Sequence, residues 1–133
     1  MSRQTLLQNE FATVWFDAER KLVHHQFHRF IAGAAFRAVL TKGLETFEKE
    51  SATKWLSDDR ENSALPLDDE RWAQTEWFPR MVKAGWKYWA IVLPQKIVGQ
   101  LNMNRHGKFF ADQGLTVNYF TDPEAALRWL EGL

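Results

Sequence analysis

Cysteine is missing from this chain of 133 residues, and so is any excess of one charge. The absence of cysteine excludes disulfide bonds, thiolate metal sites, iron–sulfur clusters and thiol nucleophiles. Seventeen basic side chains balance seventeen acidic ones. A protein held mainly by phosphate groups or anionic lipid usually carries a basic excess. We therefore do not expect nucleic acid or a membrane surface as a partner.

Long apolar runs are absent as well. The longest, at 30–36 and 88–93, fall far short of the ~20 residues that a membrane-spanning helix needs, and the first residues lack the apolar stretch of a signal peptide. The chain has no Gly-x-Ser-x-Gly motif, no Gly-rich phosphate loop and no dinucleotide-binding fingerprint. These absences favour a single cytoplasmic domain that is not an enzyme and that uses no metal or cofactor.

Aromatic residues, by contrast, are abundant: they make up 14% of the chain, which contains seven tryptophans. A small domain rarely buries that many indole rings completely. Trp72, Trp77 and Trp86 are therefore candidates for a groove or an interface, with a place in the core as the alternative. Trp72 and Trp77 are five residues apart on one expected helix, about 500° of rotation, so they do not share one line along it.

The hydrophobic pattern predicts a β-hairpin followed by alternating helices and strands. Residues 1–10 are polar and are expected to be a loose N-terminal segment. Strands are expected at 11–16, 21–30, 53–57, 87–93 and 115–120. Helices are expected at 32–51, from 68 to a stop at Gly85 with a kink at Pro79, at 102–113, and from Pro123 behind an Asp122 cap. The order β-β-α-β-α-β-α-β-α predicts an α/β domain with a mixed, mostly parallel five-stranded sheet.

The stretch 114–130 resembles the closing strand and helix of SpoIIAA-like proteins, relatives of the STAS domain. The matching positions are Tyr119, Phe120, Asp122, Glu124, Ala125, Leu127, Trp129 and Leu130. The middle of the chain is similar too: it has the acidic loop 58–60, Trp-Phe-Pro at 77–79, and Gly85 before an apolar strand that ends in Pro94. The resemblance covers residues 11–131 and implies a SpoIIAA/STAS-like fold.

What the resemblance implies about function is broader. Related folds serve as anti-sigma-factor antagonists, as regulatory domains of transporters and, in the Sec14-like branch, as lipid carriers. In the antagonist branch a phosphorylatable serine closely follows an aspartate at the end of a central strand. Here Ser57 precedes the acidic residues and Ser63 lies several residues later, so we do not expect this phosphorylation switch.

The histidines do not predict a metal site. His24 and His28 share one face of the expected strand, and His25 points to the opposite face. Four residues along a strand span roughly 13 Å, whereas two ligands of one zinc ion must each lie ~2.1 Å from it. No spacing links His106 to any of them. We expect solvated strand histidines.

The acidic loop is the other candidate site. Asp58 and Asp59 follow a strand, and open α/β sheets bind ligands at the carboxyl ends of their strands. Paired carboxylates there can hold magnesium. Arg60 follows directly and offsets their charge, so a solvated loop, a ligand-binding loop and a metal site all stay open.

Three functions follow from these observations. The first is a non-enzymatic regulatory or binding module that acts through protein–protein contacts, with an unidentified protein or a second copy as partner. The second is a carrier of a small apolar or lipid-like ligand in a tryptophan-rich groove. The third is a metal-dependent enzyme that uses Asp58 and Asp59. The resemblance and the surplus of tryptophan favour the first. The candidate binding residues are Asp58, Asp59, Arg60, Trp72, Trp77 and Trp86.

Overall fold

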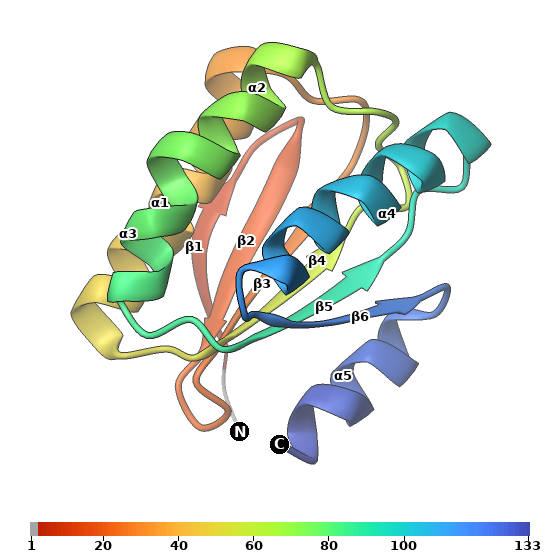
Figure 1. The fold of residues 1–133 in the computed structure, drawn as a ribbon. Coiled ribbons are helices and arrows are strands. Elements are labelled where there is room, and N and C mark those ends of the chain that lie inside the picture. The colour runs from red at the N-terminus through yellow and green to blue at the C-terminus, as the bar shows by residue number, and fades with distance from the viewer. Residues whose placement is uncertain (1–2) are drawn as a thin grey trace.

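The computed structural model describes residues 3–133, and within them six strands form one mixed sheet in the order β1-β2-β3-β4-β5-β6 (Figure 1). The strands are β1 (Gln4–Gln8), β2 (Ala12–Asp17), β3 (Leu22–Phe27), β4 (Lys54–Asp58), β5 (Tyr88–Val92) and β6 (Thr116–Phe120). The pairs β1–β2 and β2–β3 are antiparallel, whereas the pairs from β3–β4 to β5–β6 are parallel. The predicted α/β class and mixed sheet are confirmed.

The sheet has one strand more than the five that the sequence predicts, because Gln4–Gln8 is not a loose segment but the edge strand β1. The register with β2 shifts between Thr5 and Leu7. This bulge lets the adjacent side chains of Leu6 and Leu7 both pack against the main core. A bulged strand shows no clean alternation of apolar and polar residues, so the sequence pattern did not reveal it.

Helices cover both faces of the sheet. They are α1 (Gly33–Glu50), α2 (Leu67–Trp72), the π-helical turn η1 (Ala73–Trp77), α3 (Phe78–Lys83), α4 (Ile97–Asp112) and α5 (Pro123–Glu131). Figure 1 shows α5 on one side of β4, β5 and β6, while the other helices gather on the opposite side. The main core lies beneath these other helices, and a smaller core lies beneath α5. None of the helices in residues 3–133 has the length and hydropathy needed to cross a bilayer.

The predicted helix ends hold where a specific local interaction sets them. Gly85 follows α3 with φ +105°, a conformation that favours glycine. Pro79 lacks an amide hydrogen, and the helix widens into η1 just before it. The Asp122 carboxylate accepts a hydrogen bond from the Glu124 amide (3.3 Å) ahead of α5. These three ends were predictable because each depends on neighbours in sequence.

Helix α4 begins at Ile97, five residues before the predicted start at 102. Its first two turns expose Ile97, Val98 and Leu101 and bury Gly99 and Asn102. A pattern with apolar residues outside and polar or small residues inside is the reverse of the usual surface helix. Hydrophobic periodicity therefore gave no indication of these turns.

Trp55 of β4 lies at the centre of the main core and is 1% exposed. Its ring stacks on Phe47 of α1 at 6.0 Å between centroids and meets Trp77 edge-on at 5.4 Å. Gly43 of α1 sits directly over this ring: a Cβ added there would lie 2.1 Å from Cη2 of Trp55. The missing side chain at position 43 therefore sets how closely α1 approaches the sheet.

Gly43→Ala is expected to lower the free energy of unfolding by ~1–3 kcal/mol, because the added methyl group overpacks the core. This loss outweighs the gain in helix propensity of up to about 1 kcal/mol. Urea unfolding measures it. Gly132→Ala is the control, because an added Cβ there meets nothing closer than 3.7 Å. Equal stability of the Gly43→Ala variant and the wild type would contradict the close approach.

Candidate functional site

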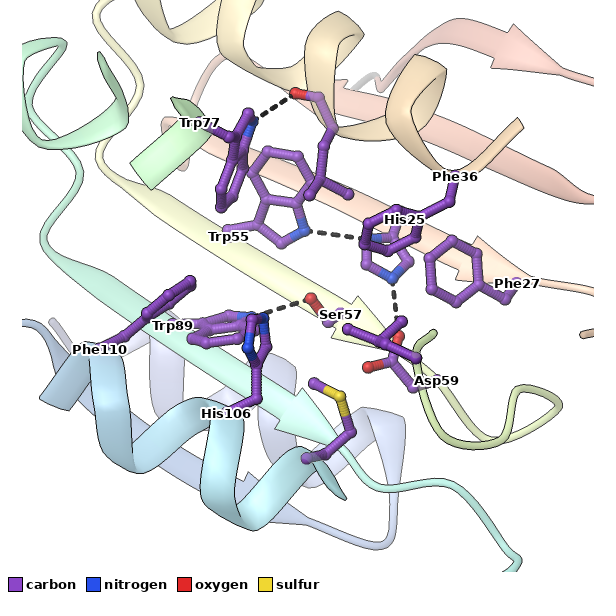
Figure 2. Close-up of a pocket in the computed structure, with 13 residues that line it drawn as sticks. His25, Phe27, Phe36, Trp55, Ser57, Asp59, Trp77, Trp89, His106 and Phe110 are labelled. Atoms are coloured by element: carbon purple, nitrogen blue, oxygen red, sulfur yellow. Dashed lines mark hydrogen bonds and ion pairs between the residues drawn. The ribbon is translucent and has the colours of Figure 1, made fainter. Parts of the chain in front are cut away.

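A small cavity lies in the main core, at the carboxyl ends of β3, β4 and β5 and beneath α1, η1 and α4 (Figure 2). Its free volume is about 30 Å³, which is room for one or two water molecules. Most of its wall is aromatic, and its polar groups come from His25, Ser57, Asp59 and His106. All four of these side chains are buried.

On the sheet side of the cavity, a chain of hydrogen bonds joins Trp55, His25 and Asp59. The Trp55 indole Nε1 donates to His25 Nδ1 (2.9 Å), and His25 Nε2 lies 2.8 Å from Asp59 Oδ1. An indole nitrogen can only donate, so His25 Nδ1 carries no proton and Nε2–H donates to Asp59. His25 is therefore neutral, and both of its ring nitrogens are occupied. This arrangement orients Asp59 but leaves His25 no free nitrogen to act as a general base.

Asp59 uses only one of its two carboxylate oxygens in this chain. Within residues 3–133, Oδ2 accepts no hydrogen bond, and Figure 2 shows it pointing toward the interior of the pocket. Ser57, two residues before Asp59, points to the same side of the sheet as Asp59 and also lines the cavity. Its hydroxyl oxygen accepts a hydrogen bond from the Trp89 indole (2.8 Å). The sheet thus presents two oxygen acceptors, from Asp59 and Ser57, to the cavity.

A second buried network holds the inner face of α4 against α2 and η1. His106 Nδ1 lies 3.5 Å from Glu70 Oε2, and Asn102 Nδ2 donates to the same oxygen (3.3 Å). Asn102 Oδ1 accepts from the Leu65 amide (2.9 Å). The hydrogen bond from His106, together with the nearby charge of Arg105, lowers the pKa of Glu70. These contacts fix which side of α4 faces the core.

The acidic pair predicted from the sequence does not converge. Asp58 lies on the sheet face that packs against α5 and forms two hydrogen bonds with Arg60 (2.9 and 2.8 Å). Asp59 lies on the opposite face and contacts His25. Successive residues of a strand alternate between faces, so neighbours in sequence are separated here by the sheet. Among residues 3–133, no group of three or more His, Cys, Asp and Glu side chains is placed to hold a metal ion.

The three candidate tryptophans do not form an open groove. Trp77 and Trp86 are buried, with ring centroids 5.2 Å apart. Each indole donates to a backbone carbonyl: Trp77 to Leu40 (2.8 Å), and Trp86 to that of the residue two positions on (3.0 Å). Trp72 is half-buried at the margin of the core, where the Arg37 guanidinium lies 5.2 Å from its ring.

Sequence reasoning missed the cavity, although one signal was present. His25 alternates in phase with the apolar Val23 and Phe27, so it had to share their buried face. A polar side chain on the buried face of a strand needs a hydrogen-bond partner. That requirement indicates a buried polar site. No comparable signal was available for His106, because the first turns of α4 were not recognised.

His24 lies on the other face of β3, away from the cavity. Its ring centroid is 4.9 Å from that of Trp15, and Arg3 Nη1 lies 3.3 Å from His24 Nδ1. The Arg3 guanidinium also stacks over the Trp15 ring at 3.9 Å. Burial, together with the positive charge of Arg3, lowers the pKa of His24 to about 3, because both disfavour the imidazolium form.

Comparisons with family models, curated proteins and solved structures found no match to this chain. The SpoIIAA/STAS-like resemblance therefore stays a prediction that depends on the residues quoted for it. Fold alone does not define function, which depends on the site and the surfaces that this chain presents.

His24 is expected to make the protein less stable as the pH falls from about 6.5 toward 3. In this window the unfolded chain binds a proton at His24 and the folded chain does not. The loss is at most ~1.4 kcal/mol per pH unit. Urea unfolding at pH 7 and pH 5 measures it, and His24→Gln, which keeps an acceptor for Arg3, is expected to reduce the loss.

The window above pH 5 separates His24 from Glu70. The lowered pKa of Glu70 contributes stability above the ordinary glutamate pKa near 4.5, and this stability is lost only as the pH falls below that value. An equal loss between pH 7 and pH 5 in the wild type and the His24→Gln variant would show that His24 titrates normally in the folded state.

Proposed function

We propose that this protein is a non-enzymatic binding module that acts through protein–protein contacts, and that the outer face of the first turns of α4 is its contact surface. The observation that supports this most strongly is the exposure of Ile97 (72%), Val98 (58%) and Leu101 (62%). Single exposed apolar residues are ordinary, but these three lie within a 100° arc of one helix. Together they form one apolar stripe.

The inner face of the same helix explains why this stripe cannot turn inward. Asn102 is held by Glu70 and by the Leu65 amide, and His106 is held by Glu70. Rotating α4 to bury the stripe would break these bonds and bring their polar groups against apolar side chains, which costs ~1–3 kcal/mol for each unsatisfied group. A partner that covers the stripe removes the same apolar area from water at no such cost.

The charges around the stripe favour a different protein over a second copy as the partner. Between residues 96 and 108 the chain carries Lys96, Arg105 and Lys108 and no acidic residue. Two of these basic residues have acidic partners: Arg105 lies 3.6 Å from the buried Glu70, and Lys108 pairs with Asp112. A partner with an apolar anchor and an acidic rim is complementary to this surface. Two copies of the stripe would instead bring their basic flanks together.

The two alternative functions have less support. A carrier of a lipid-like ligand needs an internal space far larger than about 30 Å³, and Trp77 and Trp86 are packed in the core. An enzyme built on Asp58 and Asp59 needs both carboxylates at one ion, and they lie on opposite faces of the sheet. No specific observation favours either over the contact surface on α4.

Site-specific photo-crosslinking in cells tests the contact surface. A photoreactive amino acid at position 101 is expected to form an adduct with one other protein, identified by mass spectrometry. Ile97→Glu in the same chain is expected to remove the adduct, because it places a carboxylate within the apolar stripe. The substitution should change the free energy of unfolding by no more than about 0.5 kcal/mol, since the side chain is exposed.

The matched control places the photoreactive residue at Val82 of α3, an apolar position that is 51% exposed and lies outside the stripe. Adducts that form equally from position 82, or that persist with Ile97→Glu, would contradict the proposed surface. An adduct between two copies of this chain would make the protein a homodimer through α4 and would overturn the argument from charge.

A further inference from the structure

The central cavity is lined by a carboxylate oxygen that accepts no hydrogen bond from the described residues. Asp59 is 3% exposed. Its Oδ1 accepts from His25, while its Oδ2 points into the pocket and accepts no hydrogen bond within residues 3–133 (Figure 2). No fully buried side-chain nitrogen or oxygen of residues 3–133 lacks a partner, so Oδ2 is accessible from the pocket that Asp59 lines. A charged acceptor with little access to water gains most from a donor that reaches it, and the cavity gives such a donor a place to bind.

The other polar groups of the cavity wall do not neutralise this carboxylate. Among the residues that the structure describes, no lysine or arginine lines the cavity. His25 is neutral because the Trp55 indole donates to its second nitrogen. Ser57 contributes a hydroxyl oxygen that accepts from Trp89 and has a lone pair left. His106, the fourth polar residue of the wall, faces a different carboxylate, that of Glu70 (3.5 Å). The wall thus supplies the Asp59 charge and the Ser57 hydroxyl, and none of its described side chains is paired with Asp59 as a counter-ion.

The apolar part of the wall is also suited to a positive charge. It is formed largely by the rings of Phe27, Trp55, Trp77, Trp89 and Phe110. The face of an aromatic ring carries the negative end of its quadrupole, and a desolvated cation placed over it gains ~2 kcal/mol, most strongly over tryptophan. The aromatic rings and the Asp59 carboxylate therefore select the same ligand chemistry.

We propose that this cavity binds a small organic cation, an amine or ammonium head group, with Asp59 Oδ2 as its counter-ion and the tryptophan rings as its walls. The free volume of about 30 Å³ admits a head group little larger than water. Met103 also lines the cavity, and its unbranched, flexible side chain can move to make room for a short substituent. This proposal does not depend on the outer face of α4.

Titration with methylammonium chloride, followed by the indole N–H signals of Trp55 and Trp89 in nitrogen-15 NMR spectra, tests the proposal. We expect saturable shifts of these two signals, because their rings line the cavity. Methanol, a neutral molecule of similar size, and sodium chloride at the same ionic strength should leave them unchanged. Equal shifts with methanol, or no saturable shift with methylammonium, would show that the cavity holds only water and would overturn the proposal.

Two matched variants locate the effect. Asp59→Asn keeps an oxygen for His25 Nε2–H but removes the charge, so the Kd for methylammonium should rise at least about tenfold. Asp58→Asn removes the neighbouring carboxylate on the other face of the sheet and should leave this Kd unchanged. Equal affinity in the wild type and the Asp59→Asn variant would overturn the proposal. If that variant does not fold, the comparison of methylammonium with methanol in the wild type decides the question.

Discussion

The indole of Trp55 joins the helical layer to the sheet and at the same time orients the polar groups of the cavity. Its ring lies directly beneath Gly43, so it sets the height of α1 above the sheet. Its Nε1–H donates to His25, which determines where the single proton of that imidazole lies. His25 in turn holds Asp59. The geometry of the cavity therefore depends on one side chain that packs through its ring and donates through its nitrogen.

Helix α4 links the cavity to the molecular surface. Met103 and His106 line the cavity from its inner side, while Ile97, Val98 and Leu101 lie outside. The buried hydrogen bond of Asn102 with Glu70 and the close contact of His106 with the same carboxylate explain both facts, because they decide which side of the helix faces the core. The first turns of α4 therefore leave their apolar residues to solvent or to a partner, whereas farther along the helix Met103 and Phe110 are buried as in an ordinary surface helix.

Predictions from the sequence succeeded where a structure depends on residues close together in the chain. The periodicity of α1, the Asp122 cap, the stop at Gly85 and the apolar β5 all arise from local patterns. The opposite directions of Asp58 and Asp59 are equally local, since strand residues alternate, but this consequence emerged only with the structure. Strand β1 could not be predicted, because its bulge removes the alternation and its stability comes from the edge of β2 and from the core beneath Leu6 and Leu7.

By itself, the sequence determined the α/β class, most of the elements and the absence of thiol chemistry, because composition and short-range periodicity carry that information. Only the tertiary structure decided that Trp77 and Trp86 are buried rather than exposed in an open groove, and that the first turns of α4 turn Asn102 rather than Ile97, Val98 and Leu101 toward the core. It also decided that His25, Ser57 and Asp59 of adjacent strands surround one cavity. These outcomes depend on hydrogen bonds between residues thirty or more positions apart, and no local pattern encodes which distant partner satisfies a buried polar group.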